Sequence, residues 1–124
     1  MTAEFHILRL KGNDNVVSEI HSFFQERNID SAMPVEARGK IKNFGVITLG
    51  KGRHLFRDDS GKGFEVNAIS GKVHRDKNGF YTNISIVLVP NGVGSIHGVL
   101  KDAQVEDFLE LKFRKLNLGN IIVA

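Results

Sequence analysis

Alternation of apolar and polar positions predicts β-strands along most of the chain. Residues 4–10 and 64–69 alternate with a period of two, which places every second side chain on one face of a sheet. The segment 80–89 is the most apolar of these, so we expect it to lie in the centre of the sheet. Shorter strands are predicted at residues 31–36, 41–49, 53–57 and 94–100. Pro34 cannot donate a ladder hydrogen bond, so we expect it at a sheet edge or a bulge.

Residues 16–27 have the spacing of an amphipathic helix instead. Their apolar positions recur every three or four residues, at Val16, Val17, Ile20, Phe23 and Phe24. Asn13, Asp14 and Asn15 precede them, and a short polar side chain there can accept a hydrogen bond from the first free helical amides. Asn28 is expected to end this helix, which is the principal one that the sequence predicts.

The C-terminal part of the chain fits two patterns. The alternation of Leu109, Leu111 and Phe113 favours a strand over residues 105–116, with a helical or irregular entry near Asp102. The alternative is a helix, whose apolar face would be formed by Val105, Phe108, Leu109 and Leu116. Residues 121–123 (Ile-Ile-Val) are expected to form a last short strand or a tail that docks on a neighbouring subunit.

Turn sequences separate the predicted elements. They fall at residues 50–52, 76–79 and 90–92, and residues 58–63 (Asp-Asp-Ser-Gly-Lys-Gly) predict a hairpin turn. One helix among many closely spaced strands predicts an α+β fold, mainly an antiparallel β-sheet with one principal amphipathic helix. A length of 124 residues suffices for one hydrophobic core, so we expect a single domain over residues 1–124.

The composition excludes several classes of site and location. The chain contains no cysteine, which removes disulfides, thiolate zinc sites and cysteine nucleophiles. Its first residues lack the basic and apolar regions of a signal peptide, and no apolar run approaches the roughly 20 residues that span a bilayer. We therefore expect a cytoplasmic protein with no membrane partner.

Positive charge is concentrated in one part of the chain. The net charge is +3, and residues 37–57 contain no Asp or Glu. The candidate contacts to nucleic-acid phosphates are the cations of this basic stretch, Arg38, Lys40, Lys42, Lys51, Arg53 and Arg57. The alternative is a solvated sheet face that is balanced by acids from elsewhere in the fold. Only Phe44 and Phe56 lie among these cations, which is few for stacking on bases.

Local catalytic and metal-binding motifs are weak. Residues 45–51 have the spacing of a phosphate-binding loop, but Gly52 stands where a magnesium-binding Ser or Thr is required. No GxSxG nucleophile motif occurs. No HxH, HxxxH or HExxH pair occurs among the histidines, although three of them could converge in space, namely His54, His74 and His97. The residues by themselves predict no catalytic group and no cofactor.

The order of several segments resembles the PPC (plant and prokaryote conserved) family. Residues 12–14 (Gly-Asn-Asp) are similar to the turn before the family's helix, and residues 64–73 to its fEvlsLsGnv segment. Residues 81–86 stand in the place of the family's HlHvSL strand, and residues 94–100 in that of a glycine-rich segment ending in GGHL. The likeness extends over nearly the whole chain.

The resemblance also implies a metal site of three histidines, which this chain lacks. The corresponding positions hold Tyr81, Asn83 and Val99. A phenol and an amide are poor ligands beside imidazole, and valine offers none, so the resemblance implies that the family's metal site is lost. His97 lies two residues before Val99, on the same strand face, and is a candidate displaced ligand. Together these four residues form a candidate relic pocket.

The resemblance implies an α+β domain that assembles as a homotrimer. Plant members carry AT-hook segments beside the domain, and this chain has no Arg-Gly-Arg-Pro core. We expect a non-enzymatic oligomeric binding module, associated with DNA through a DNA-binding protein partner or through the basic stretch. The alternative is a small-molecule-binding protein or enzyme that uses the pocket around Tyr81, Asn83 and His97, with His97 as a general base.

Overall fold

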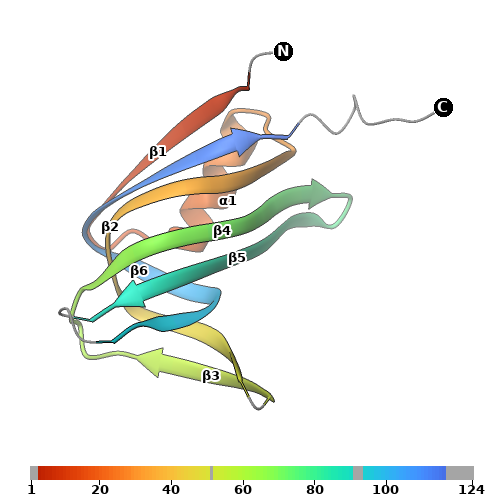
Figure 1. Ribbon diagram of the computed structural model, residues 1–124. Coiled ribbons are helices and arrows are strands. Elements are labelled where there is room, and N and C mark those ends of the chain that lie inside the picture. Colours follow the sequence, from red (N-terminus) through yellow and green to blue (C-terminus); the bar gives the residue numbers. More distant parts are fainter. Residues whose placement is uncertain (1–2, 51, 91–93, 117–124) are drawn as a thin grey trace.

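In the described residues the strands pair in antiparallel order, and one helix packs against them (Figure 1). The structure is a computed structural model that describes residues 3–50, 52–90 and 94–116. Its elements are β1 (Phe5–Lys11), α1 (Val16–Glu26), β2 (Ser31–Gly50), β3 (Gly52–Asp58), β4 (Phe64–Asp76), β5 (Gly79–Val89) and β6 (Ile96–Lys115). The predicted α+β fold, mainly an antiparallel sheet with one principal helix, is confirmed.

Four of the strands close into a ring. β6 pairs with β5, β5 with β4, β4 with β2, and β2 again with β6. One edge of β2 pairs with β6, and its other edge pairs first with β4 and then with β3. In the same way, β5 and β1 follow one another along the edge of β6 that faces away from β2. The sheet is therefore a small barrel with β1 and β3 as outer strands.

The helix packs its apolar stripe against the interior of this sheet. Four of the five apolar residues predicted from the helical spacing are buried, namely Val16, Ile20, Phe23 and Phe24, and Val17 is partly buried. The ring of Phe24 meets Phe80 and Phe113 edge to face, with centroid distances of 6.0 and 5.0 Å. At the other end of the stripe, the Asn15 side chain caps the helix by accepting a hydrogen bond from the Ser18 amide. No helix in the described residues is both long and apolar enough to cross a membrane.

Two strands are longer than the sequence predicted. Segments 31–36 and 41–49 belong to the single 20-residue strand β2, in which Pro34 lies at a bulge as expected. Segments 94–100 and 105–116 likewise merge into β6. The helical alternative for residues 105–116 is wrong, because β6 pairs there with β1 along one edge and with β2 along the other. Of the helical or irregular entry predicted near Asp102, the helical form is wrong, because Asp102 lies within β6 and pairs with Gly45 of β2. The irregular form is confirmed, because the register between β2 and β6 shifts on both sides of this pair.

The predicted hairpin turn at residues 58–63 is also wrong. β3 ends opposite Phe44 and β4 begins opposite Ile41, so both strands run along the same edge of β2 and the chain keeps its direction between them. The Asp58 carboxylate accepts hydrogen bonds from the amide and hydroxyl of Ser60, which makes a local turn without pairing the strands on either side. The predicted turn at 76–79 does join the paired strands β4 and β5. Residues 91–92 and 121–123 lie outside the described residues.

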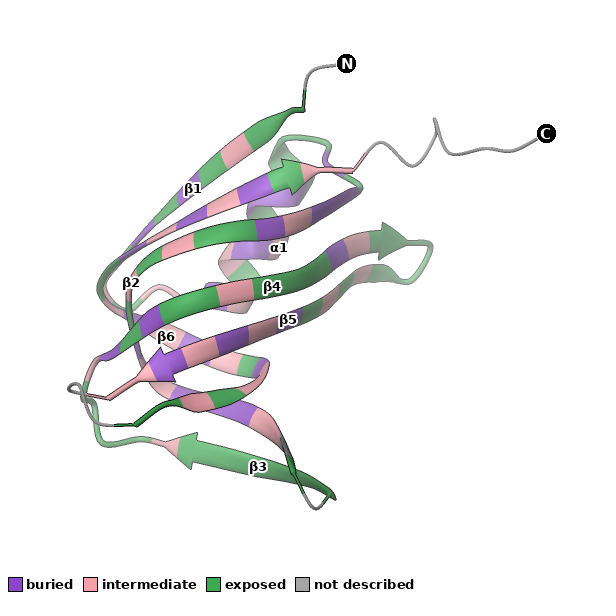
Figure 2. Ribbon diagram, in the orientation of Figure 1, coloured by how far each residue is buried: buried purple, intermediate pink, exposed green. Residues whose placement is uncertain are grey.

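The strand β3 is exposed on both of its faces. Among the described strands it pairs with β2 alone, and each residue from Gly52 to Arg57 is exposed. Leu55 and Phe56 keep 60% and 38% of their surface accessible. Figure 2 shows β3 as an almost uniformly exposed strand, in contrast to the alternating burial of β5. Exposed apolar groups on an unpaired sheet edge are a surface that proteins commonly cover with another chain.

Candidate binding site

The four residues of the relic pocket lie on the outward face of β5 and β6. On β5, the even-numbered residues from 84 to 88 are buried in the core, so the odd-numbered residues face outward. Tyr81 and Asn83 belong to this outward set. His97 and Val99 of β6 lie directly opposite two further outward residues of β5, so they share the same face. The sequence therefore predicted correctly that His97 and Val99 point in one direction.

A fork between β5 and β6 opens a cavity beside Tyr81 and Asn83. The two strands are paired only as far as Ser85 and Val99, after which β6 turns towards β2. A cavity of about 550 Å³ lies at this point, and we call it the fork cavity. Tyr81, Asn83 and Val99 all line it, together with Arg53 from β3 and Lys101 from β6. The fold thus brings together three of the four predicted residues.

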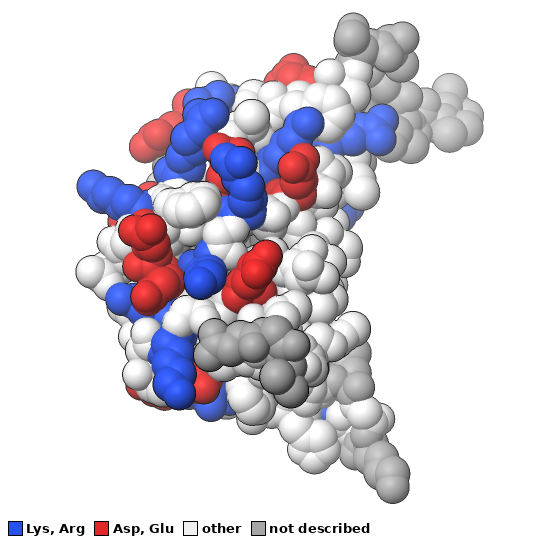
Figure 3. All heavy atoms as spheres, turned by 60° about the vertical axis from the view of Figure 1, so that its left-hand side comes forward, with Lys and Arg blue, Asp and Glu red and all other residues white. Residues whose placement is uncertain are grey.

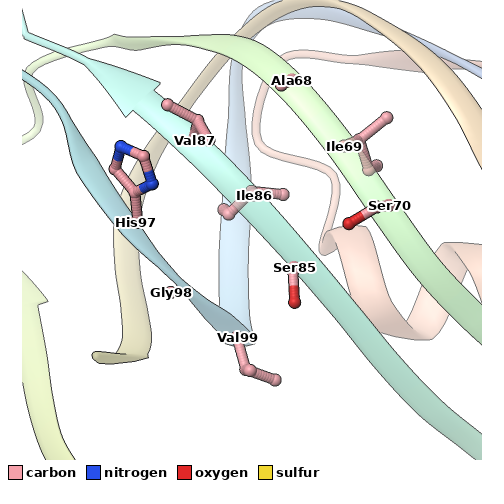
Figure 4. A pocket seen from close by; sticks show the side chains of 9 residues that line it. All are labelled: Ala68, Ile69, Ser70, Ser85, Ile86, Val87, His97, Gly98 and Val99. Carbon is pink, nitrogen blue, oxygen red and sulfur yellow. The ribbon is translucent and has the colours of Figure 1, made fainter. Parts of the chain in front are cut away.

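His97 lines a different cavity. This second hollow, of about 360 Å³, lies between β4, β5 and β6, where Figure 4 shows His97 beside Val87 and across from Ser70. Val99 lines both cavities, whereas Tyr81 and Asn83 line only the fork cavity. The imidazole Nε2 of His97 lies 3.1 Å from the Ser95 hydroxyl. The fold thereby separates His97 from the two residues with which it was predicted to form one pocket.

The side chains at the fork do not suit a transition-metal ion. Tyr81, Asn83 and Val99 provide a phenol, an amide and an aliphatic group, where such a site needs imidazole or carboxylate donors. No group of three His, Asp or Glu side chains in the described ranges is arranged to hold a metal ion. The three histidines that could have converged lie on separate strands, with His54 on β3, His74 on β4 and His97 on β6.

Three cations of the basic stretch lie beside acids. Arg38 is 3.6 Å from the Glu110 carboxylate and Lys42 is 3.7 Å from the Glu106 carboxylate. Arg57 donates to Asp102 at 2.9 Å, and its hydrogen bonds to Asp59 and Asp102 raise the pKa of its guanidinium. Figure 3 shows basic and acidic side chains intermingled over the face of the molecule that it draws.

The remaining cations of the stretch have different surroundings. Neither Lys40 nor Arg53 takes part in an ion pair with another described residue. Lys51 lies outside the described residues. Residues 45–50 of the motif with phosphate-loop spacing form the end of β2, and β3 follows instead of the helix that such a loop requires. For the paired cations, the geometry favours the balanced sheet face over a bare basic surface.

One charged residue of the fork cavity was missed by sequence reasoning. Lys101 lies outside the basic stretch, and nothing in its local sequence distinguishes it from other strand lysines. The pairing of Val99 with Ile47 brings this part of β6 against the end of β2, from which β3 turns back with Arg53. Only this long-range pairing places the two cations around one cavity.

Comparisons with known proteins agree on one family and fold. A family model described as the Plants and Prokaryotes Conserved (PCC) domain matches residues 2–111. A metal-containing protein of Archaeoglobus fulgidus has a similar structure, with a TM-score of 0.77 at 22% identity, over 91% of this chain and 79% of that one. The plant- and prokaryote-conserved (PPC) protein of Pyrococcus horikoshii gives 0.77 at 13% identity, over 94% and 82% of the two chains.

A third structure has the same fold. A candidate DNA-binding protein of Ralstonia eutropha JMP134 gives a TM-score of 0.71 at 13% identity, over 90% of this chain and 77% of that one. At such low identities these likenesses establish the fold alone. No sequence match was found among curated proteins.

Proposed function

Because the chain belongs to the Plants and Prokaryotes Conserved domain family, also written PPC, we propose that it is a non-enzymatic, DNA-associated binding module that works as a homotrimer. The observation that carries the proposal is the exposed strand β3. Its successive apolar side chains Leu55 and Phe56 are exposed on the two faces of an outer strand, which a second copy of the chain would cover.

A second group of exposed apolar side chains supports assembly. Phe5 and Ile7 on β1 and Phe108 on β6 are exposed, although they lie where β1 and β6 are paired. Lys112 extends over the ring of Phe5, with its ammonium nitrogen 4.7 Å from the ring centroid. Such a mixed apolar and charged surface is typical of interfaces between subunits that also exist apart.

DNA association is proposed at the level of the whole assembly. The structurally similar protein of Ralstonia eutropha is described as a candidate DNA-binding protein. In this chain Glu110 and Glu106 offset Arg38 and Lys42, so one subunit would contact phosphates weakly. Three copies on one scaffold would bind more tightly than one, because the later contacts form within a single complex.

Fluorescence anisotropy with a labelled DNA duplex tests this form of the proposal. We expect the logarithm of the affinity to fall linearly with the logarithm of the salt concentration, because binding releases counterions from the DNA. The triple variant Arg38→Gln, Lys40→Gln and Lys42→Gln should lose most of the affinity. Glu110→Gln should increase affinity, because it removes the carboxylate that holds both Arg9 and Arg38.

Lys77→Gln is the matched control for these variants, because it removes an exposed lysine at the β4–β5 turn, away from the basic stretch. Duplex binding that is equal in the wild type and the triple variant would show that residues 38–42 do not contact DNA. A wild type that binds no duplex even at low salt would leave association through a DNA-binding protein partner as the remaining form of the proposal.

A further inference from the structure

The fork cavity is lined by cations and neutral polar groups, and none of its lining residues is acidic. We propose that it binds a small organic anion, with a carboxylate or phosphate head and an apolar body. Such a ligand would place its head between Arg53 and Lys101 and its body against the apolar wall of the cavity. This site is distinct from the cations of the basic stretch proposed for DNA, of which only Arg53 lines it.

The two cations lack local counter-charges. Neither Arg53 nor Lys101 forms an ion pair with another described residue, whereas Arg38, Lys42 and Arg57 all do. Asp102, the residue after Lys101, is bound to Arg57. Asp102 does not line the fork cavity, and it faces a separate hollow together with Arg57 and Asp59. A positive potential therefore remains at the fork.

Neutral donors from β5 complete the polar side of the cavity. The hydroxyl of Tyr81 and the amide of Asn83 are not used in side-chain hydrogen bonds within the described part of the chain. Tyr81 is 58% exposed. Thr82 between them is held by the helix, because its hydroxyl lies 2.6 Å from the His21 Nε2. A phenol and a primary amide can each donate to an anionic oxygen. Lys72, directly opposite Asn83 on β4, adds a further positive charge nearby.

The rest of the lining is apolar and determines the size of the ligand. Val17 from α1, Ile47 from β2, and Val99 and Leu100 from β6 form this wall. A cavity with an apolar wall and a few convergent polar groups is the usual form of a small-molecule site. An inorganic ion would leave the wall unused, and a nucleic-acid backbone has no apolar body to place there. A single-ring organic acid matches both sides of the cavity.

An NMR titration of the intact, isotope-labelled protein tests the inference with three probes of one ring size. Benzoate and phenyl phosphate carry the two candidate heads, and benzyl alcohol is their neutral counterpart. We expect benzoate or phenyl phosphate to give saturable shifts in the amide signals of residues 81–83 and 99–101, and benzyl alcohol to give none. The stronger of the two anions identifies the head group that the site prefers.

Charge-neutral variants locate the binding. Arg53→Gln and Lys101→Gln should each weaken binding of the preferred anion by about ten-fold or more, since each removes one charge-assisted hydrogen bond. Lys77→Gln should leave binding unchanged. A well-dispersed spectrum shows that each variant is folded, and the two substitutions on different strands provide independent tests.

Three results would overturn the inference. The first is equal binding of benzyl alcohol and the anions, which would mean that the cavity is only an apolar hollow. The second is saturation of shifts elsewhere in the protein. The third is unchanged anion affinity in both Arg53→Gln and Lys101→Gln. None of these results bears on the trimer. The residues that are substituted to test DNA binding, 38, 40, 42 and 110, do not line the fork cavity, so the two sets of variants test separate proposals.

Discussion

Two glycines allow neighbouring strands to approach more closely than a side chain would permit. Gly71 of β4 has a φ of +118° and Gly39 of β2 a φ of +131°, a region that other residues rarely adopt. A Cβ at Gly71 would overlap the carbonyl oxygen of Asn83, and one at Gly39 would overlap that of Phe108. The backbone atoms that each added Cβ would meet belong to paired strands, and they cannot move aside without breaking the hydrogen bonds between those strands.

Gly71→Ala should therefore lower the free energy of unfolding by about 2–4 kcal/mol, from backbone strain and the displaced strand. Urea denaturation followed by circular dichroism measures this loss. Gly50→Ala is the matched control, because no atom lies within 4 Å of its added Cβ. Equal stabilities of the two variants would show that β4 and β5 tolerate a wider spacing at Gly71.

At the scale of residues, sequence reasoning found the cations but not their partners. Residues 37–57 are free of acids, yet Glu106 and Glu110 reach Lys42 and Arg38 from β6. The register between β2 and β6 decides these pairs, and several bulges alter that register. Composition alone cannot place a bulge, so it could not show which cations are offset.

At the scale of elements, His21 joins the helix to the sheet. Its Nε2 lies 2.6 Å from the Thr82 hydroxyl, and its ring stacks on Phe80 with a centroid distance of 5.4 Å. Burial in this contact lowers the pKa of His21. The folded chain therefore binds a proton at this position less readily than the unfolded chain, whose histidine has a pKa of about 6.5.

The stability that His21 provides should be complete above about pH 6.5 and should be lost as the pH falls through the lowered pKa of the folded state. His21→Gln keeps a hydrogen-bonding group near Thr82 but cannot titrate in this range. Thermal unfolding between about pH 5 and pH 8 should show a shallower pH dependence for this variant than for the wild type. Parallel curves would mean that His21 does not couple protonation to folding.

The elements themselves were predicted with different success for a physical reason. The helix from Val16 to Glu26 and the strand β5 have strong local patterns and were found almost to the residue. The division of β2 and β6 into shorter strands was wrong, because glycines such as Gly39 suggested breaks. There the close approach of Phe108 requires a glycine inside a continuous strand. The segment 58–63 likewise has the composition of a hairpin but not its long-range pairing.

The candidate site could be predicted only in part. The family resemblance placed Tyr81, Asn83 and Val99 together, and the fork cavity brings them together. The separate cavity of His97 and the arrival of Lys101 depend on where β6 leaves β5 for β2, and no local pattern marks that point. Sites formed by diverging strands are in this sense properties of the fold rather than of any segment.

At the scale of the whole molecule, the fold closes a barrel but leaves two outer strands. β1 carries exposed Phe5 and Ile7, and β3 carries exposed Leu55 and Phe56. In a chain of 13.8 kDa, the surface left uncovered is large relative to the core, and association is a common means of burying it. The proposed trimer would cover these strands and give the weak DNA contacts of each subunit a common scaffold.

Native mass spectrometry of the untagged protein tests this central claim most directly. We expect a principal species of about three times the 13.8 kDa chain mass at micromolar concentration, with no bound transition metal. Substituting Leu55 and Phe56 together by Ser should shift the population towards the single chain without unfolding it, because both side chains are exposed in one subunit. A wild-type protein that remains at 13.8 kDa at micromolar concentration would contradict the assembly on which the proposed function depends.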